Sequence, residues 1–190
     1  MKTIYYTASS LDGFLADEYH SLDWLFQFGE IESMKDHYPR FLGKVRAIAM
    51  GASTYRWLLE HERMLEDPSR WPYRMPSWIF SHRDLPPIPG ADLRFVRGDV
   101  AKVHPEMARE AGGGDLWLCG GGDLVGQFHD AGLLDEIVVT FAPVTLGKGV
   151  PLLPRRIESP ALRLMEVEKH GEVFAVLSYA VTYGSVEDRA

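Results

Sequence analysis

The sequence has little of what several protein classes require. It contains one cysteine, Cys119, so an internal disulfide is excluded and a reducing, cytoplasmic compartment is favoured. No apolar run approaches the ~20 residues that a membrane-spanning helix needs. Lys and Arg number 20 against 27 Asp and Glu, the formal net charge is −7, and the basic residues form no cluster. We therefore expect neither a membrane nor a nucleic acid as partner.

Metal ligands, a signal peptide and repeats are not indicated either. The 7 histidines are scattered and none lies at metal-ligand spacing from another, so the sequence predicts no metal site. The opening residues MKTIYYTAS predict a strand instead of a signal peptide. Cys119 lies in an apolar stretch, which favours a buried, inert thiol over a nucleophile. Without a linker between two cores, the chain is predicted to be a single domain over residues 1–190.

Strands and helices are predicted to alternate along most of the chain. Strands are expected at 2–8, 45–50, 77–81, 93–96 and 116–119, and helices at 31–42, 53–61, 99–111 and after the glycines at 120–122. The expected helix caps are Asp99, and Ser53 or Ala52. The last part differs, with long strands at 136–142, 162–169 and 173–183 and a hairpin turn at 170–172. This order predicts an α/β fold with a mainly parallel central sheet, helices on both faces and a C-terminal antiparallel hairpin.

The most informative segment runs from Asp115 to Pro154. It predicts a buried strand, then Gly120, Gly121 and Gly122, then a helix, which is the arrangement of a phosphate-binding turn. A simple tight turn would use the same residues. The glycine spacing does not fit a dinucleotide-binding fingerprint, and no Walker A pattern follows. The segment therefore indicates either a site for a nucleotide or other phosphorylated ligand, or a turn alone.

The sequence as a whole resembles the dihydrofolate reductase-like fold family. It is most similar to the branch that contains the C-terminal reductase domain of the bifunctional riboflavin-biosynthesis deaminase/reductase. The resemblance covers nearly the whole length and is carried by SSLDGFLA, SLDWL, MGASTY, WPYRMPSWIFSHR, RGDV, LWLCGGGDL, GLLDEI and APVTLGKGVPLL. It implies an NADPH-dependent reductase of a small heterocyclic substrate, of the 5-amino-6-(5-phosphoribosylamino)uracil reductase type. It also implies a homodimer that forms through the C-terminal strands.

The resemblance also implies where the cofactor lies. Two segments would hold the pyrophosphate, one would meet the adenosine 2′-phosphate, and one would border the nicotinamide. The pyrophosphate residues are Gly51, Ala52, Ser53 and Thr54, with Gly120, Gly121, Gly122, Asp123, Leu124 and Val125; the 2′-phosphate residues are Ser81, His82 and Arg83; the nicotinamide residues are Ala8 and Gly13. Arginine suits a phosphate dianion because it offers paired donors, although His82 and Arg83 would also fit a solvated strand end.

The substrate side is less well specified. Asp12 is the candidate acid or substrate-orienting group beside the nicotinamide, and the alternative is a turn residue before Gly13. Asp23 and Trp24 are the candidate substrate-binding residues. Asp23 precedes Trp24, whereas folate reductases place their carboxylate after a tryptophan. Two alternatives to the riboflavin-type reductase therefore stay open, a dihydrofolate reductase proper and an NADP-binding dimer without turnover.

Overall fold

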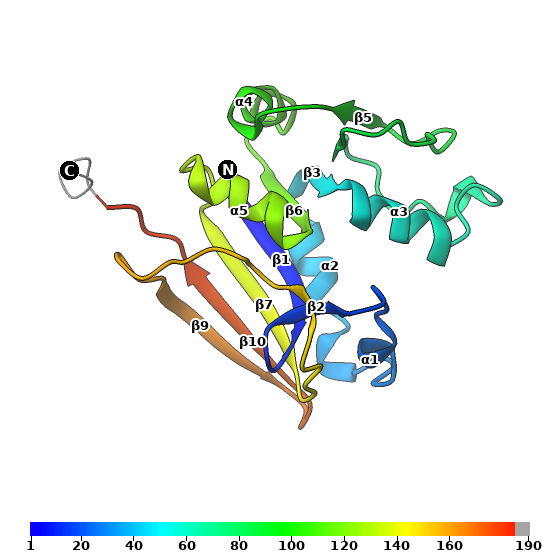
Figure 1. The fold of residues 1–190 in the computed structure, drawn as a ribbon. Coiled ribbons are helices and arrows are strands. Elements are labelled where there is room, and N and C mark those ends of the chain that lie inside the picture. The colour runs from blue at the N-terminus through cyan, green and yellow to red at the C-terminus, as the bar shows by residue number, and fades with distance from the viewer. Residues whose placement is uncertain (185–190) are drawn as a thin grey trace.

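The computed structural model describes residues 1–184, so the last six residues of the predicted domain lie outside the described part of the chain. An eight-stranded sheet in the order β5-β4-β3-β6-β1-β7-β10-β9 forms its centre (Figure 1). Its strands are β1 (Thr3–Ser10), β3 (Val45–Gly51), β4 (Ser77–Phe80), β5 (Leu93–Val96), β6 (Asp115–Gly120), β7 (Glu136–Ala142), β9 (Arg163–His170) and β10 (Phe174–Ala180). The helices are α1 (Asp23–Phe26), α2 (His37–Leu42), α3 (Ala52–His61), α4 (Val100–Glu110) and α5 (Gly122–Asp130).

The predicted fold class is confirmed, because the first six strands of this order are parallel and helices cover both faces. Alternation along β1 divides the core: Tyr5 packs in the cluster that includes residues of α4 and α5, and Tyr6 in the cluster that includes residues of α3 and packs against α2. Both strand faces are buried, which explains the nearly continuous apolar runs of the sequence.

The predicted C-terminal hairpin is also confirmed. β10 pairs antiparallel with β7 on one side and with β9 on the other, so β9 is the edge strand of the sheet. The pairing of Phe174 with His170 puts the turn of this hairpin at the same end of the sheet as the carboxyl ends of the parallel strands. In Figure 1 β9 lies at the border of the molecule, next to β10.

The single helix expected at 31–42 is wrong. The structure has a short 3-10 helix, η1 (Glu32–Met34), and then α2, which begins at His37. Pro39 explains the break, because a proline ring clashes with the carbonyl group four residues earlier and therefore prevents a helix from running through Lys35. A small second sheet was not predicted: β2 (Phe14–Asp17) pairs antiparallel with β8 (Gly149–Pro151).

The N-terminus of α4 has a side-chain cap, whereas those of α3 and α5 have none. Asp99 caps α4 as predicted, because its carboxylate accepts a hydrogen bond of 2.8 Å from the Ala101 N–H. Neither Ser53 nor Ala52 caps α3. Gly51 is the N-cap of α3 and Gly121 is the N-cap of α5, and neither helix has a side-chain cap. The first N–H groups of these two helices are therefore without side-chain acceptors.

Candidate cofactor site

Two uncapped helix N-termini meet at the carboxyl edge of the sheet. β3 and β6 are neighbouring parallel strands, and the pairing of Met50 with Gly120 brings their ends together. A Cβ atom built on Gly51 would lie 3.8 Å from the Gly121 nitrogen, so the starts of α3 and α5 are in contact distance of each other. Two positive dipole ends with free N–H groups form a strong site for an anion with more than one phosphate.

The three glycines at the end of β6 serve three different purposes. Gly120 has a φ of +139°, which other residues rarely adopt. A Cβ on Gly121 would meet no atom within 4 Å, so this position faces open space beside the two helix N-termini. A Cβ on Gly122 would lie 2.5 Å from the Leu152 carbonyl oxygen, so this glycine permits a close approach of two backbone segments. Of the three positions, Gly121 is the one at which an added side chain would meet no neighbouring part of the protein.

The other residues predicted at the pyrophosphate are either buried apolar residues or hydroxyl residues near the surface. Leu124 and Val125 are buried in the core, so they can offer a ligand only their backbone groups. Thr54 lies near the glycines, with its Oγ1 atom 3.4 Å from the position of a Cβ on Gly120. Ser53 is exposed at the start of α3. Thr54 is thus the predicted hydroxyl residue that the structure brings beside the glycine turn.

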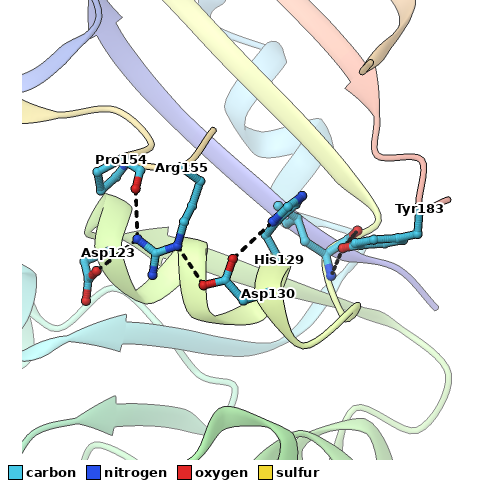
Figure 2. Close-up of polar contacts among 7 residues, drawn as sticks. Asp123, His129, Asp130, Pro154, Arg155 and Tyr183 are labelled. Atoms are coloured by element: carbon cyan, nitrogen blue, oxygen red, sulfur yellow. Dashed lines mark hydrogen bonds and ion pairs between the residues drawn. The ribbon is translucent and has the colours of Figure 1, made fainter. Parts of the chain in front are cut away.

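Asp123 has a partner within the protein. Its carboxylate accepts hydrogen bonds from Gln127 and from Arg155, whose guanidinium group also contacts Asp130 (Figure 2). Arg155 can lie across α5 because Gly126 has no side chain: a Cβ there would come within 2.5 Å of the guanidinium carbon. The Asp123 side chain therefore fastens the segment after β8 to α5, and a pyrophosphate-binding role would fall to its backbone.

The predicted 2′-phosphate residues lie directly after β4. Ser81 closes a turn, because its hydroxyl group accepts a bond of 2.9 Å from the Arg83 N–H and donates one of 2.8 Å to the Arg83 carbonyl. This turn leaves His82 and Arg83 exposed. Ser81 and Arg83 line a hollow of about 170 Å³ together with Arg97, which pairs with Asp84.

Arg97 is a candidate that the sequence analysis did not select. It comes directly after β5, in the RGDV segment that carried part of the resemblance, and the parallel pairing of β4 with β5 brings it beside Arg83. Two arginines at one hollow suit a phosphate dianion better than one. The larger hollow, of about 340 Å³, lies at the C-terminal half of α3 and is lined by residues such as Leu59, Arg63 and Leu85, away from the glycine turn at the start of that helix.

Asp12 lies in the loop after β1 as predicted, but its carboxylate is occupied. It accepts hydrogen bonds from the Ser10 hydroxyl at 2.6 Å and from the N–H groups of Leu146 and Gly147 at 3.0 and 2.7 Å. The Ser10 hydroxyl and these N–H groups hold the pKa of Asp12 below its usual range. A carboxylate kept ionised in this way is a poor proton donor. The contacts favour the alternative of a turn residue, one that joins two loops.

The remaining predicted residues lie on β1, in the loop after it and in α1. Ala8 is half-buried on β1, and Gly13 has a φ of +86°, which explains the glycine after Asp12. Asp23 is exposed in the first turn of α1. The Trp24 indole N–H is buried and has no hydrogen-bond partner among residues 1–184, so an acceptor atom on a ligand could satisfy it. Of the two candidate substrate residues, Trp24 has such a buried atom, and the substrate-binding role of both stays a prediction.

Cys119 lies on β6 directly before the glycine turn. Burial raises the pKa of its thiol to about 12, so the thiolate is not formed at neutral pH. A raised pKa agrees with the predicted inert thiol, although Cys119 is only partly buried.

The sheet order, the antiparallel last strands and the glycine-lined edge define a protein with the dihydrofolate reductase-like fold. The dihydrofolate reductase of Enterococcus faecalis, solved as a complex with NADP(H), superposes with a TM-score of 0.60 over 94% of this chain and 95% of that one, at 11% identity. At that identity the likeness concerns the fold alone.

Sequence comparison then gives the family. The model of the RibD C-terminal domain matches residues 2–176, and the chain belongs to that family. The uncharacterized protein YwjB of Bacillus subtilis (strain 168) is 30% identical over 172 residues, which cover 90% of this chain and 93% of YwjB. A protein of Shewanella sp. PV-4 assigned to riboflavin biosynthesis has a TM-score of 0.80 and 25% identity, over 95% of this chain and 98% of that one. Within residues 1–184, none of the helices has the length and apolar character to cross a membrane.

Proposed function

We propose that this protein is an NADPH-dependent reductase of a small heterocyclic substrate, of the type that reduces a ribosylaminopyrimidine in riboflavin biosynthesis. The observation that carries the proposal is the meeting of two uncapped helix N-termini at Gly51 and Gly121. Such a pair supplies N–H donors and positive dipole ends to both phosphates of a pyrophosphate. Membership in the RibD C-terminal domain family supports the substrate class.

The cofactor would lie along the carboxyl edge of the sheet. Gly51 at the end of β3, Thr54 in the first turn of α3 and the turn at Gly121 after β6 would hold the pyrophosphate. Arg83 and Arg97 would meet the 2′-phosphate in the hollow at the ends of β4 and β5. This placement agrees with the general rule that open sheets of parallel strands bind ligands beyond their carboxyl ends. When bound, NADPH supplies the hydride.

The protein would contribute to catalysis by binding and orienting the cofactor and the substrate and by excluding water. The nicotinamide would lie beside Ala8 and the loop at Gly13, because β1 ends there. The ionised Asp12 would hold this loop to Leu146 and Gly147 and so fix the border of the nicotinamide site. The buried indole N–H of Trp24 would orient a substrate acceptor atom. Asp12 would therefore position the loop and would not donate a proton.

The reductase proposal is tested by the oxidation of NADPH, followed through the absorbance of the reduced nicotinamide. We expect oxidation with the phosphoribosylaminopyrimidine substrate and little with dihydrofolate, and none without substrate. Failure to bind NADPH would contradict the proposal outright. The Gly121→Val variant is the control, because it should fold and yet not bind the cofactor.

One observation favours a second function. The carboxylate predicted as catalytic, Asp12, already accepts hydrogen bonds from three residues, so it is poorly suited to be the proton donor of a reduction. A nucleotide-binding protein without turnover would need no such group. Tight NADPH binding together with no oxidation against pyrimidine, pterin and folate substrates would support this second function.

We also propose that the protein is a homodimer that forms through β9. This edge strand carries Leu164, Met165 and Val167 with exposed fractions of 51%, 50% and 60%. An apolar edge strand is a liability in a monomer, and pairing with a second copy covers it. Light scattering tests the proposal: a mass near 21.5 kDa would contradict it, and about twice that mass would support it.

A further inference from the structure

Three side chains from distant parts of the chain converge beside the hairpin of β9 and β10. They are His37 at the start of α2 and Glu168 and His170 at the end of β9, and their ligand atoms all lie within 4.8 Å of one another. The His37 Nε2 atom is 3.3 Å from one Glu168 oxygen, and the His170 Nε2 atom is 3.5 Å from the other. The sequence predicted no metal because the histidines do not pair along the chain, but the fold pairs two of them in space.

The hydrogen bond on the far side of His170 fixes its tautomer. The Nδ1 atom lies 2.8 Å from the Ser33 carbonyl oxygen, which can only accept, so Nδ1 carries the hydrogen. In neutral His170 the Nε2 atom therefore has a lone pair. This atom is buried, makes no hydrogen bond within residues 1–184, and faces a carboxylate oxygen. A lone pair and a carboxylate repel each other unless a proton or a metal ion lies between them.

His37 is held in a similar way. Its Nδ1 atom lies 2.8 Å from the hydroxyl group of Tyr6 on β1. A phenol oxygen can accept a hydrogen bond as well as donate one. In the tautomer that carries its hydrogen on Nδ1, His37 donates to Tyr6 and its Nε2 atom has a lone pair toward Glu168; in the other tautomer Nε2 donates to Glu168. Metal-binding histidines in proteins use this arrangement, in which the second ring nitrogen donates to a carbonyl, carboxylate or hydroxyl oxygen.

We propose that His37, Glu168 and His170 bind a divalent transition-metal ion, with zinc as the preferred ion. Two imidazole nitrogens and one carboxylate are typical zinc ligands, whereas calcium and magnesium require oxygen ligands. Ligands about 2.0–2.1 Å from a tetrahedral zinc ion lie roughly 3.3 Å apart, and the two measured nitrogen–oxygen separations are 3.3 and 3.5 Å. The fourth position would be open to water.

The site would join two parts of the fold that the backbone does not pair. His37 belongs to α2, and Glu168 and His170 belong to the edge strand β9. The side chains of both histidines are 10% exposed, while that of Glu168 is 29% exposed. The carboxylate therefore offers an entry path to the ion. A metal ion would hold the hairpin against α2 and η1, and its loss would loosen the hairpin first.

The experiment uses the full chain, stripped of metal with a chelator and titrated with Zn²⁺ by calorimetry. We expect one Zn²⁺ per chain and a rise of the thermal midpoint on zinc addition. Co²⁺ in place of Zn²⁺ should give visible absorption bands of four-coordinate cobalt. None of these readouts depends on reductase activity, so a failed function proposal would leave them unchanged.

The variants Glu168→Gln and His170→Ala should each weaken Zn²⁺ binding by more than the 10–100-fold that loss of a supporting hydrogen bond costs. Tyr6→Phe keeps all three ligands and should weaken it less. The matched control is His61→Gln, because His61 lies 3.9 Å from Glu62 in an exposed pair that should bind no ion. If the wild-type chain does not bind Zn²⁺ at micromolar concentration, or if Glu168→Gln binds it equally well, the proposal is wrong and the cluster is a hydrogen-bonded triad only.

Discussion

The two neighbouring glycines Gly121 and Gly122 should respond in opposite ways to an added side chain. Gly121 has a φ of −75° and a ψ of 169°, which any residue adopts, and a Cβ there meets nothing within 4 Å. Gly121→Val should therefore leave the free energy of unfolding within about 0.5 kcal/mol of the wild type. Its methyl groups would occupy the space that the pyrophosphate needs.

The expected loss of NADPH affinity follows from the contacts that this position controls. A hydrogen bond from an N–H group to a charged phosphate contributes about 1.5–3 kcal/mol. Loss of one such bond corresponds to about 10- to 150-fold weaker binding, and loss of two to more. Fluorescence titration with NADPH measures this change, and circular dichroism during heating measures stability on the same samples.

Gly122→Ala is the matched control. Its Cβ would lie 2.5 Å from the Leu152 carbonyl oxygen and 2.6 Å from that of Pro151, and both are backbone atoms that cannot rotate away. Forcing a methyl group into such a contact costs about 1–3 kcal/mol, which lowers the melting temperature of a chain of this size by several degrees. If Gly121→Val binds NADPH as the wild type does, or if both variants melt alike, the assignment of the glycine turn is refuted.

Three further perturbations test other parts of the structure. Arg83→Ala should weaken NADPH by about 1–3 kcal/mol and NADH little, and calorimetric titration that finds equal losses for the two cofactors would refute the 2′-phosphate assignment. The pKa of Asp12 in the folded chain lies below its unfolded value of about 3.9. The stabilisation from its ionised carboxylate is therefore present above about pH 3.9 and is lost as the pH falls through the folded pKa. The melting temperatures of wild type and Asp12→Asn should differ at pH 7 and converge in acid, and a difference that is constant with pH would contradict this. Val167→Asp on β9 should shift the mass measured by light scattering from dimer to monomer, whereas an unchanged dimer would place the interface elsewhere.

Much of the fold could be predicted because its signals are local. The strand, glycine turn and helix around Gly121 lie within one short segment, and the Asp99 cap depends on an N–H two residues later. The hairpin of β9 and β10 is also contiguous in sequence. Apolar runs bounded by turn residues are sufficient for such features.

The features that the sequence analysis predicted wrongly or missed depend on contacts between distant residues or on competing local effects. The apolar pattern at 31–42 favoured one helix, but Pro39 stopped it from running back through Lys35. Arg97 became a site candidate only when β4 and β5 were paired. His37 and His170 meet because α2 packs on the sheet beside the last hairpin, and no spacing rule reaches across that separation.

Labelling of the single cysteine can measure how often the central strands of the sheet separate. Cys119 lies on β6 between β3 and β1, it is only partly exposed, and burial raises the pKa of its thiol. A thiol reagent should therefore react slowly with the folded chain and faster with molecules in which this strand has separated from its neighbours. The rate of labelling, compared with that of the unfolded chain, sets a lower limit on the free energy of that opening without any introduced probe. Repeating the measurement with NADPH would show whether a ligand at the glycine turn keeps the central strands closed.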